Sequence, residues 1–307
     1  MRHWMNRART LLLGDMEGMG VIALLLLYLL LVDVALMYLN PFLYMLSTMF
    51  KTTADLLDPT VKWIPTSMEW ANLKLAWDGL QFPKALKSSL TISLASAGGQ
   101  IVVCSLAGYS FARLKFPGRN LLFGLLVFSF LIPPQTLIIP LYVLYRKLDL
   151  LGSPMAIITP ALLGHGLRGA LFVIIFRQFF STLPKELEDA ALIDGAGPFR
   201  VYWKVMVPLA KPAVLVVFLF SFVWHWNETF ITGLVLNGSD LPLSVSLSHL
   251  DKVLRGMYGG DGTEPSFDLN ETIRMAASFL IIMPPLIVYL IAQRWFVEGV
   301  ERTGLVE

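Results

Sequence analysis

Charged residues and cysteine are both scarce in this chain. Asp, Glu, Lys and Arg make up 15% of the 307 residues, whereas a soluble domain carries about a quarter. Because 56% of the residues are hydrophobic and the mean hydropathy is +0.66, the composition indicates an integral membrane protein. The single cysteine, Cys104, excludes a disulfide framework and a metal site built on several cysteines. A net charge of +2 with no dense basic tract gives no sign of nucleic-acid binding.

The sequence also lacks the machinery to use ATP. It contains no G-x-x-x-x-G-K-[ST] run, which is the loop that cradles ATP phosphates. Strand-like alternation of polar and apolar residues is missing as well, and a chain that satisfies its own backbone in lipid must then be helical. We therefore expect an all-α polytopic membrane protein that is not an enzyme, with no catalytic residue, no bound cofactor and no metal site.

Six apolar segments are long enough to cross a bilayer, which takes about 20 residues. The first is too long for a signal peptide and lacks a small-residue cleavage site, so it is expected to remain as a span. We predict one transmembrane domain over residues 21–297, between a cytoplasmic N-terminus (1–20) and a cytoplasmic tail (298–307). The predicted spans are residues 21–46, 88–111, 121–145, 155–180, 213–236 and 276–296.

Lys and Arg are slightly more frequent on the connections that are cytoplasmic if the N-terminus is inside. Both termini are therefore expected in the cytoplasm. Two external connections are long. Residues 51–87 carry three tryptophans and predict a short interfacial helix, whereas the Gly-rich residues 257–268 predict a turn or flexible loop. Prolines inside the predicted spans indicate kinks at Pro133–Pro134, Pro140, Pro160 and Pro284–Pro285.

The most distinctive connection is residues 182–208, which is charged and rich in Gly and Pro although it lies between two spans. Thr182 is expected to cap a helix that begins near Leu183, and Gly195 to end that helix in a left-handed conformation. Pro198 then starts a second short helix that runs to Pro208. This helix–turn–helix is either a docking surface for another protein or an amphipathic segment that anchors the next span at the lipid headgroups.

The spacing of this stretch resembles the EAA loop of ABC importer permeases, E-A-A-x3-G-x9-I-x-L-P. Asp189-Ala190-Ala191 is followed at the motif's intervals by Gly195 and Pro208. An aspartate stands where the motif has glutamate, and valines stand where it has isoleucine and leucine. Glu188 is a second acid beside the first, so the sequence leaves open which of the two makes the charge contact.

The resemblance extends over nearly the whole chain. The runs IPPQTLIIPLYVLYRKLDL, WNETFITGLVL and QRWFVEGVERTGL resemble segments of carbohydrate importer permeases of the maltose type, particularly the smaller, six-span subunit of that family. In this family the EAA loop forms coupling helices that sit in a cleft of the ATPase subunit. The residues that the resemblance assigns to this role are Glu188, Asp189, Ala190, Ala191, Gly195 and Pro208.

The resemblance implies a function and a set of partners. The chain would be one permease subunit of an importer in the cytoplasmic membrane of a bacterium or archaeon, moving a sugar or oligosaccharide inward by alternating access. ATP and Mg would be used by a partner ATPase dimer, which the tail of residues 296–307 would also contact. A second permease subunit, expected to be a different chain, and an extracytoplasmic sugar-binding protein complete the assembly.

Candidate residues of the substrate pathway are polar or aromatic groups inside predicted spans, where they are costly unless they serve a purpose. Residues 164–169 interrupt the fourth span with glycines, and a Trp–Asn–Glu cluster lies in the fifth. The alternatives are an interfacial belt for the tryptophans and a satisfied interhelical pair for the residues of the fourth span. The predicted pathway residues are His165, Arg168, Trp226, Asn227 and Glu228.

Two other functions remain open from the sequence. An ABC importer for a solute other than sugar would carry the same EAA loop. A proton-coupled secondary transporter would need a relay of intramembrane acids and usually an internal repeat, and Asp33 and Glu228 alone give it little support.

Overall fold

The computed structural model describes residues 14–15, 18–238, 240–258 and 271–304, with side chains described for 20–238, 240–257 and 271–295. The expected all-α fold is confirmed: helices form nearly all of the described chain. Its strands are β1 (Gly14–Asp15) and β2 (Gly18–Met19), a two-residue antiparallel ladder. The predicted loop at residues 257–268 and the last residues of the tail lie largely outside the described residues.

The chain divides into two compact units, Met1–Lys74 with Asp268–Phe279 and Leu75–Phe267 with Leu280–Glu307. The first unit holds α2 (Val21–Thr48) and α3 (Thr53–Leu57), whereas α4 (Ala71–Gly79) crosses its boundary. After α2 the chain folds back on itself, because the Lys51 ammonium donates hydrogen bonds to the carbonyls of Val61 and Lys62, both at 2.9 Å. The buried Asn72 amide donates to two further carbonyls of this turn.

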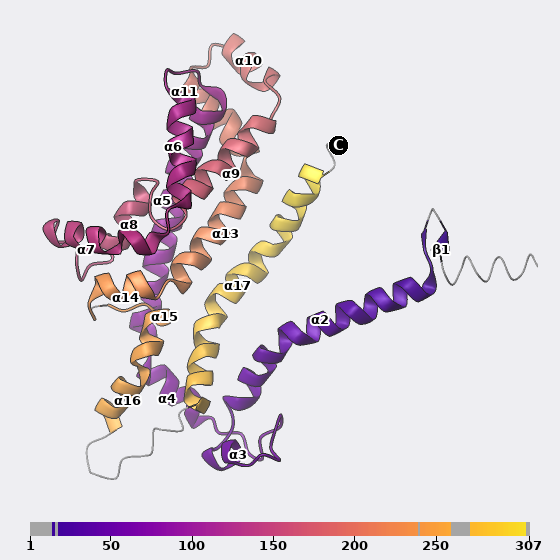
Figure 1. Cartoon of the computed structure of the whole chain (residues 1–307), viewed down its shortest axis with the longest axis vertical. Coiled ribbons are helices and arrows are strands. Elements are labelled where there is room, and N and C mark those ends of the chain that lie inside the picture. Colours follow the sequence, from indigo (N-terminus) through magenta and orange to yellow (C-terminus); the bar gives the residue numbers. More distant parts are fainter. Residues whose placement is uncertain (1–13, 16–17, 239, 259–270, 305–307) are drawn as a thin grey trace, which may run out of the picture. The chain divides into compact units, whose positions relative to one another are not determined.

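The second unit contains the remaining helices (Figure 1). α17 (Glu271–Gly304) begins in the first unit and continues into the second. The helices between them are α5 (Phe82–Arg113), α6 (Arg119–Leu131), η1 (Pro134–Leu137), α7 (Ile138–Lys147), α8 (Met155–Leu162), α9 (Gly169–Thr182), α10 (Glu186–Ile193), α11 (Pro198–Val201), η2 (Tyr202–Met206), α12 (Val207–Leu209), α13 (Lys211–Asn227), α14 (Phe230–Leu236), α15 (Leu243–Ser246), η3 (Leu247–His249) and α16 (Leu250–Tyr258).

Helix α5 is the centre of this unit, and it packs against α8, α9, α13 and α15. Two glycines bring its backbone close to its neighbours. A Cβ atom at Gly108 would lie 2.5 Å from the Cβ of Phe176 in α9, and one at Gly99 would lie 2.6 Å from the Leu162 side chain in α8. The phenylalanines of α9 and Tyr202 complete a buried aromatic core on the same side of α5.

Helices α2, α5 and Glu271–Trp295 of α17 are each long and apolar enough to cross a membrane as one piece. Breaks interrupt the third, fourth and fifth predicted spans, and those in the third and fourth were expected from their prolines and glycines. The third is split at Pro133 into α6 and the segment Pro134–Lys147, which lie at 94° to each other. The fourth is split between α8 and α9, where residues 163–168 are not helical, and the fifth at Glu228 and Thr229.

Proline does not explain all of these interruptions. Pro133 and Pro134 coincide with the break in the third span, as predicted. Pro160, Pro284 and Pro285 instead lie inside helices that continue past them. The break in the fourth span follows from the glycines, because Gly164 and Gly166 adopt φ values of +75° and +71°, which disfavour other residues.

Candidate functional site

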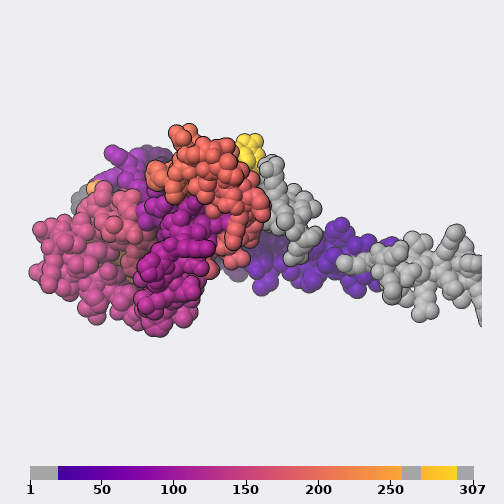
Figure 2. Space-filling model, turned by 90° about the horizontal axis from the view of Figure 1, so that it is seen from above, coloured from indigo at the N-terminus to yellow at the C-terminus, as the bar shows by residue number. Residues whose placement is uncertain are grey.

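The connection at residues 182–208 forms a cap at one end of the second unit, beside the α5–α6 connection (Figure 1, Figure 2). Its first helix, α10, begins at Glu186 and ends before Gly195, which has φ +79° as the left-handed C-cap predicted from the sequence. The prediction for Thr182 was wrong. Thr182 is the last residue of α9, and its hydroxyl donates to the Phe179 carbonyl within that helix, so it does not cap α10.

The second half of this connection is a helix with an irregular turn. It starts at Pro198, as predicted, and runs through α11, the π-helical turn η2 and α12 to Leu209. Within η2 the Tyr202 side chain is fully buried, and its hydroxyl lies 2.6 Å from the Ser105 hydroxyl of α5. This hydrogen bond fixes the returning segment to the central helix.

The two acids of α10 have different environments. Glu188 is half-buried, and its Oε1 lies 3.4 Å from Nε of Arg113, the last residue of α5. Arg113 also donates from Nη2 to the Leu183 carbonyl. Burial raises the pKa of Glu188, an effect that the neighbouring Arg113 charge partly offsets. Asp189 is exposed. The structure therefore uses Glu188 inside the chain and leaves the Asp189 carboxylate open to a partner.

The surface around Asp189 has the composition of a docking site. The side chain of Ile193 is 86% exposed and that of Phe199 is 69% exposed, although both are large and apolar. Ala190, Gly195 and Pro208 are exposed as well, whereas Ala191 packs toward the aromatic core. Exposed apolar side chains next to charged ones typically mark protein–protein contacts. Figure 2 looks onto this end of the unit and shows the connection at its surface.

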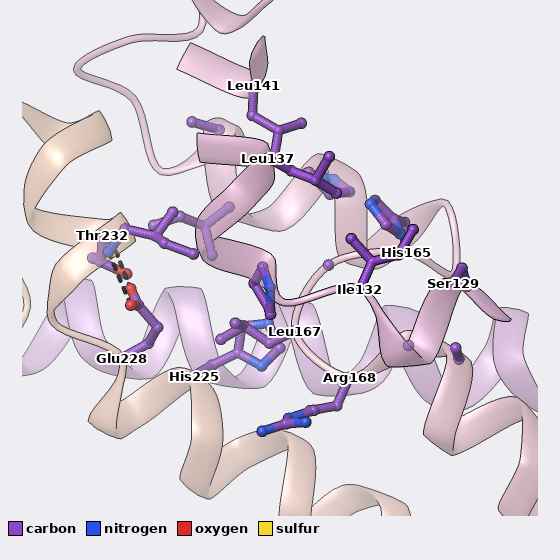
Figure 3. A pocket seen from close by; sticks show the side chains of 18 of the residues that line it. Ser129, Ile132, Leu137, Leu141, His165, Leu167, Arg168, His225, Glu228 and Thr232 are labelled. Atoms are coloured by element: carbon purple, nitrogen blue, oxygen red, sulfur yellow. Dashed lines mark hydrogen bonds between the residues drawn. The ribbon is translucent and has the colours of Figure 1, made fainter. Parts of the chain in front are cut away.

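A cavity of about 130 Å³ lies where the broken third, fourth and fifth spans meet (Figure 3). Three of the predicted pathway residues, His165, Arg168 and Glu228, line it together with His225. The other two do not. Trp226 is buried, and its indole N–H donates to the Ile281 carbonyl at 3.2 Å, whereas Asn227 is exposed elsewhere.

The interrupted part of the fourth span is held in place by Gln100 of α5. Its amide nitrogen donates to the carbonyls of His165 and Leu167 at 2.9 and 3.0 Å. Its amide oxygen accepts from the Ser221 hydroxyl of α13 at 2.6 Å. Gln100 and Ser221 are fully buried, so this network positions the cavity wall without exposing polar groups to lipid.

The charged groups of the cavity do not pair with each other. The Glu228 carboxylate accepts hydrogen bonds from the backbone N–H groups of Ile231 and Thr232, at 2.9 and 2.6 Å, and so caps α14. The Arg168 guanidinium lies 5.6 Å from the ring centroid of Trp224 and 6.0 Å from that of Phe130. An interhelical pair between His165 and Arg168 is not found among the described contacts.

Three important residues were missed by the sequence reasoning. Gln100 lies within an apolar run, and an intramembrane polar residue is itself a signal that could have singled it out, whereas His225 was noted in the polar cluster of the fifth span but not chosen as a pathway residue. Arg113 was counted only as a cytoplasmic charge. Nothing in the sequence indicates that Arg113 and Glu188, which are far apart along the chain, come together.

Comparisons with known proteins agree on one family. Residues 101–302 match the family described as binding-protein-dependent transport system inner membrane component. The chain is 33% identical over 242 residues to the sn-glycerol-3-phosphate transport system permease protein UgpE of Pectobacterium atrosepticum, covering 77% of this chain and 81% of that protein. It is 29% identical to a probable ABC transporter permease protein of Pyrococcus horikoshii, covering 87% and 92%.

A solved structure has the same fold. It is a bacterial ABC transporter described as involved in the import of the acidic polysaccharide alginate. The match has a TM-score of 0.74 and 24% sequence identity, and it covers 89% of this chain and 95% of that chain.

Proposed function

Because the chain belongs to the family of binding-protein-dependent transport system inner membrane components and is an ABC importer permease subunit, we propose that it moves a sugar or sugar derivative inward, coupled to an ATPase through residues 182–208. The observation that supports the coupling role is the exposed Asp189 beside the exposed Ile193 and Phe199. The cargo class is supported by the 33% identity to a permease for sn-glycerol 3-phosphate.

The contact acid is Asp189. Glu188 is already engaged with Arg113 and half-buried, so of the two adjacent acids only Asp189 presents its carboxylate to solvent. A basic side chain in the ATPase cleft would pair with it, while Ile193 and Phe199 would be buried in the same contact. Because α10 is tied to α5 by Arg113, a displacement of the docked segment would be passed to the membrane helices as a rigid movement.

The remaining components follow from this assignment. ATP and Mg belong to the partner ATPase dimer, and the tail of residues 296–307 contacts that dimer. A second, different permease subunit completes the pathway, and an extracytoplasmic binding protein delivers the cargo. Both termini of the chain are cytoplasmic in this arrangement, which puts residues 182–208 on the same side as the ATPase.

A charge reversal tests the coupling assignment. We expect Asp189→Lys to lower ATP-driven uptake by about a hundredfold or more, because it places like charges across the docked interface. The ATPase should then no longer co-purify with the membrane subunits. Glu186→Lys is the matched control, since Glu186 lies in the first turn of the same helix and is also exposed.

The control variant should keep most of the uptake. Wild-type uptake and an intact ATPase complex in Asp189→Lys would remove the basis for the docking assignment. If the wild-type complex hydrolyses ATP but imports only a solute unrelated to sugars, the cargo class is wrong and the importer assignment stands.

A further inference from the structure

The cavity at the broken spans contains a cation without a counter-ion. Within the described part of the chain no carboxylate lies within ion-pair distance of Arg168, and Glu228 turns its carboxylate to the backbone of α14. Arg168 is exposed on this chain although it lies inside the predicted fourth span, residues 155–180. A lipid-facing arginine at that depth is costly, so the side chain must face protein or a polar pathway.

The backbone around Arg168 adds further positive potential. Arg168 is the N-cap of α9, a helix of 14 residues, and Gly169 and Ala170 of its first turn line the cavity. The first N–H groups of a helix have no partner within it, and the helix dipole makes this end favourable for anions. Arg168 also has φ +59°, an unfavourable conformation for a residue with a side chain. The fold holds Arg168 in that conformation at the N-terminus of α9.

A second, independent group in the cavity also lacks a partner. His225 is only 3% exposed, and its Nε2 has no hydrogen-bond partner among the described residues. Its Nδ1 lies 2.8 Å from the Ser221 carbonyl, to which it donates in the neutral ring. Nε2 is then an acceptor on a side chain that lines the cavity, and an acceptor is suited to a hydroxyl group of a ligand (Figure 3).

Resting on the importer function above, we propose that this cavity binds an anionic group of the cargo, a phosphate ester or carboxylate, next to a cargo hydroxyl. Arg168 and the first turn of α9 bind the anion, and Nε2 of His225 accepts from the hydroxyl. At about 130 Å³ the cavity has room for such a group and its neighbouring carbon atoms, and a second cavity of about 420 Å³ adjoins it at Arg168 and Glu228. The cargo would be a sugar acid, a sugar phosphate or a polyol phosphate.

The first experiment identifies the cargo. The complete transporter is reconstituted in vesicles with its binding protein, and the cargo released from purified binding protein is identified by mass spectrometry. We expect a phosphorylated or carboxylated molecule, and the mass separates these two. A neutral cargo that is imported with wild-type kinetics would overturn the anion site while leaving the importer function intact.

The second experiment locates the anion. Arg168→Gln is expected to raise the half-saturating concentration of the charged cargo by about tenfold or more, as for the loss of a charge-assisted hydrogen bond. Arg168→Lys should recover much of this loss. Arg177→Gln is the matched control, because Arg177 lies in the same helix over the Phe123 ring, 4.0 Å from its centroid, and does not line the cavity.

The uncharged counterpart of the cargo separates binding from structure. If Arg168 contacts the anion, Arg168→Gln and wild type should import the counterpart equally well. An equal defect for charged and uncharged cargo would instead show that Arg168 only stabilises the protein or pairs with a carboxylate of the second permease. Absence of any ATP-driven import by the wild-type complex would refute the importer function itself.

Discussion

Two side chains of α5 hold non-helical backbone in place, and they do so with different chemistry. Gln100 donates to the carbonyls of His165 and Leu167 at the cavity, through a neutral amide. Arg113 donates to the Leu183 carbonyl and faces the Glu188 carboxylate in the connection at residues 182–208, through a charged guanidinium. We refer to them as the amide clamp and the guanidinium clamp. Thirteen residues separate them, about 20 Å along the helix.

Each type of clamp suits its surroundings. Gln100 is fully buried, where a charge would be expensive to desolvate and a neutral amide with all its hydrogen bonds made is not. Arg113 lies at the end of α5, and its partner Glu188 keeps part of its side chain in solvent. The amide clamp should therefore be insensitive to salt and pH, whereas the guanidinium clamp depends on the ionisation of Glu188. The comparison predicts that changes of pH act on the contact at Glu188 and not on the cavity wall.

The largest effect is expected from breaking the amide clamp. Gln100→Leu would leave two backbone carbonyls and the Ser221 hydroxyl without their partner, a loss of roughly 2–4 kcal/mol in the free energy of unfolding. The thermal unfolding temperature of the purified complex should fall clearly, and by the same amount at low and high salt. Gln293→Leu, at an exposed position of α17, should leave it unchanged.

An unchanged unfolding temperature in Gln100→Leu would mean that the cavity wall holds without the amide. A decrease that depended strongly on salt would contradict the difference drawn between the two clamps.

A smaller effect is expected from breaking the guanidinium clamp. Arg113→Gln leaves the half-buried Glu188 carboxylate without a counter-charge, which we estimate to cost about 1–3 kcal/mol locally. Hydrogen exchange should accelerate in α10 and hardly change in α8. Because burial raises the pKa of Glu188, Arg113→Gln should be least harmful at acidic pH, where this carboxyl is protonated.

The double variant Arg113→Gln with Glu188→Gln should recover part of the protection, since it removes both charges together. Lys115→Gln, at an exposed lysine just beyond the same end of α5, is the control for loss of a positive charge. Exchange in α10 that is equally slow in the single variant would refute the clamp.

The smallest effect concerns a charged contact outside the two clamps. Asp55 accepts hydrogen bonds from the hydroxyl and the N–H of Thr66, and the Thr66 hydroxyl holds the pKa of Asp55 below its ordinary value. A lowered folded pKa stabilises the fold above the unfolded value and loses that contribution as pH falls through the folded pKa. The connection after α2 should therefore loosen in acid.

Limited proteolysis of residues 51–74 at falling pH measures this loosening. Asp55→Asn should abolish most of the pH dependence while keeping the Thr66 hydroxyl contact. If the variant and the wild type respond to acid alike, another group controls this connection.

The sequence predicted the helical fold and the Gly195 cap because each depends on local properties. Apolar runs of span length require helices in lipid, and a glycine after an amphipathic run favours a left-handed cap. It predicted the break at residues 164–169 for the same reason. The break at Glu228 was not predicted, because no neighbouring Gly or Pro indicates a turn there. It depends on the Glu228 carboxylate, which caps α14.

The site was predicted less completely than the fold. His165, Arg168 and Glu228 do reach one cavity, but the sequence could not place Trp226 in the core instead. A tryptophan at a span is compatible with an interface, a pathway or a core position, and only the neighbouring helices decide. The pairing of Glu188 with Arg113 likewise could not be predicted, because the position of Arg113 is set by tertiary packing.

The two glycine contacts of α5 have a mechanical consequence. Gly99 against α8 and Gly108 against α9 are nine residues apart, about 13 Å along the axis, and at each the partner's atoms occupy the place of a side chain. Sliding α5 along either neighbour would push these atoms against the larger residues on each side. Sliding of α5 is therefore opposed at two points, by α8 at Gly99 and by α9 at Gly108. A displacement of α10 would therefore reach the cavity with little sliding of α5 against α8 and α9.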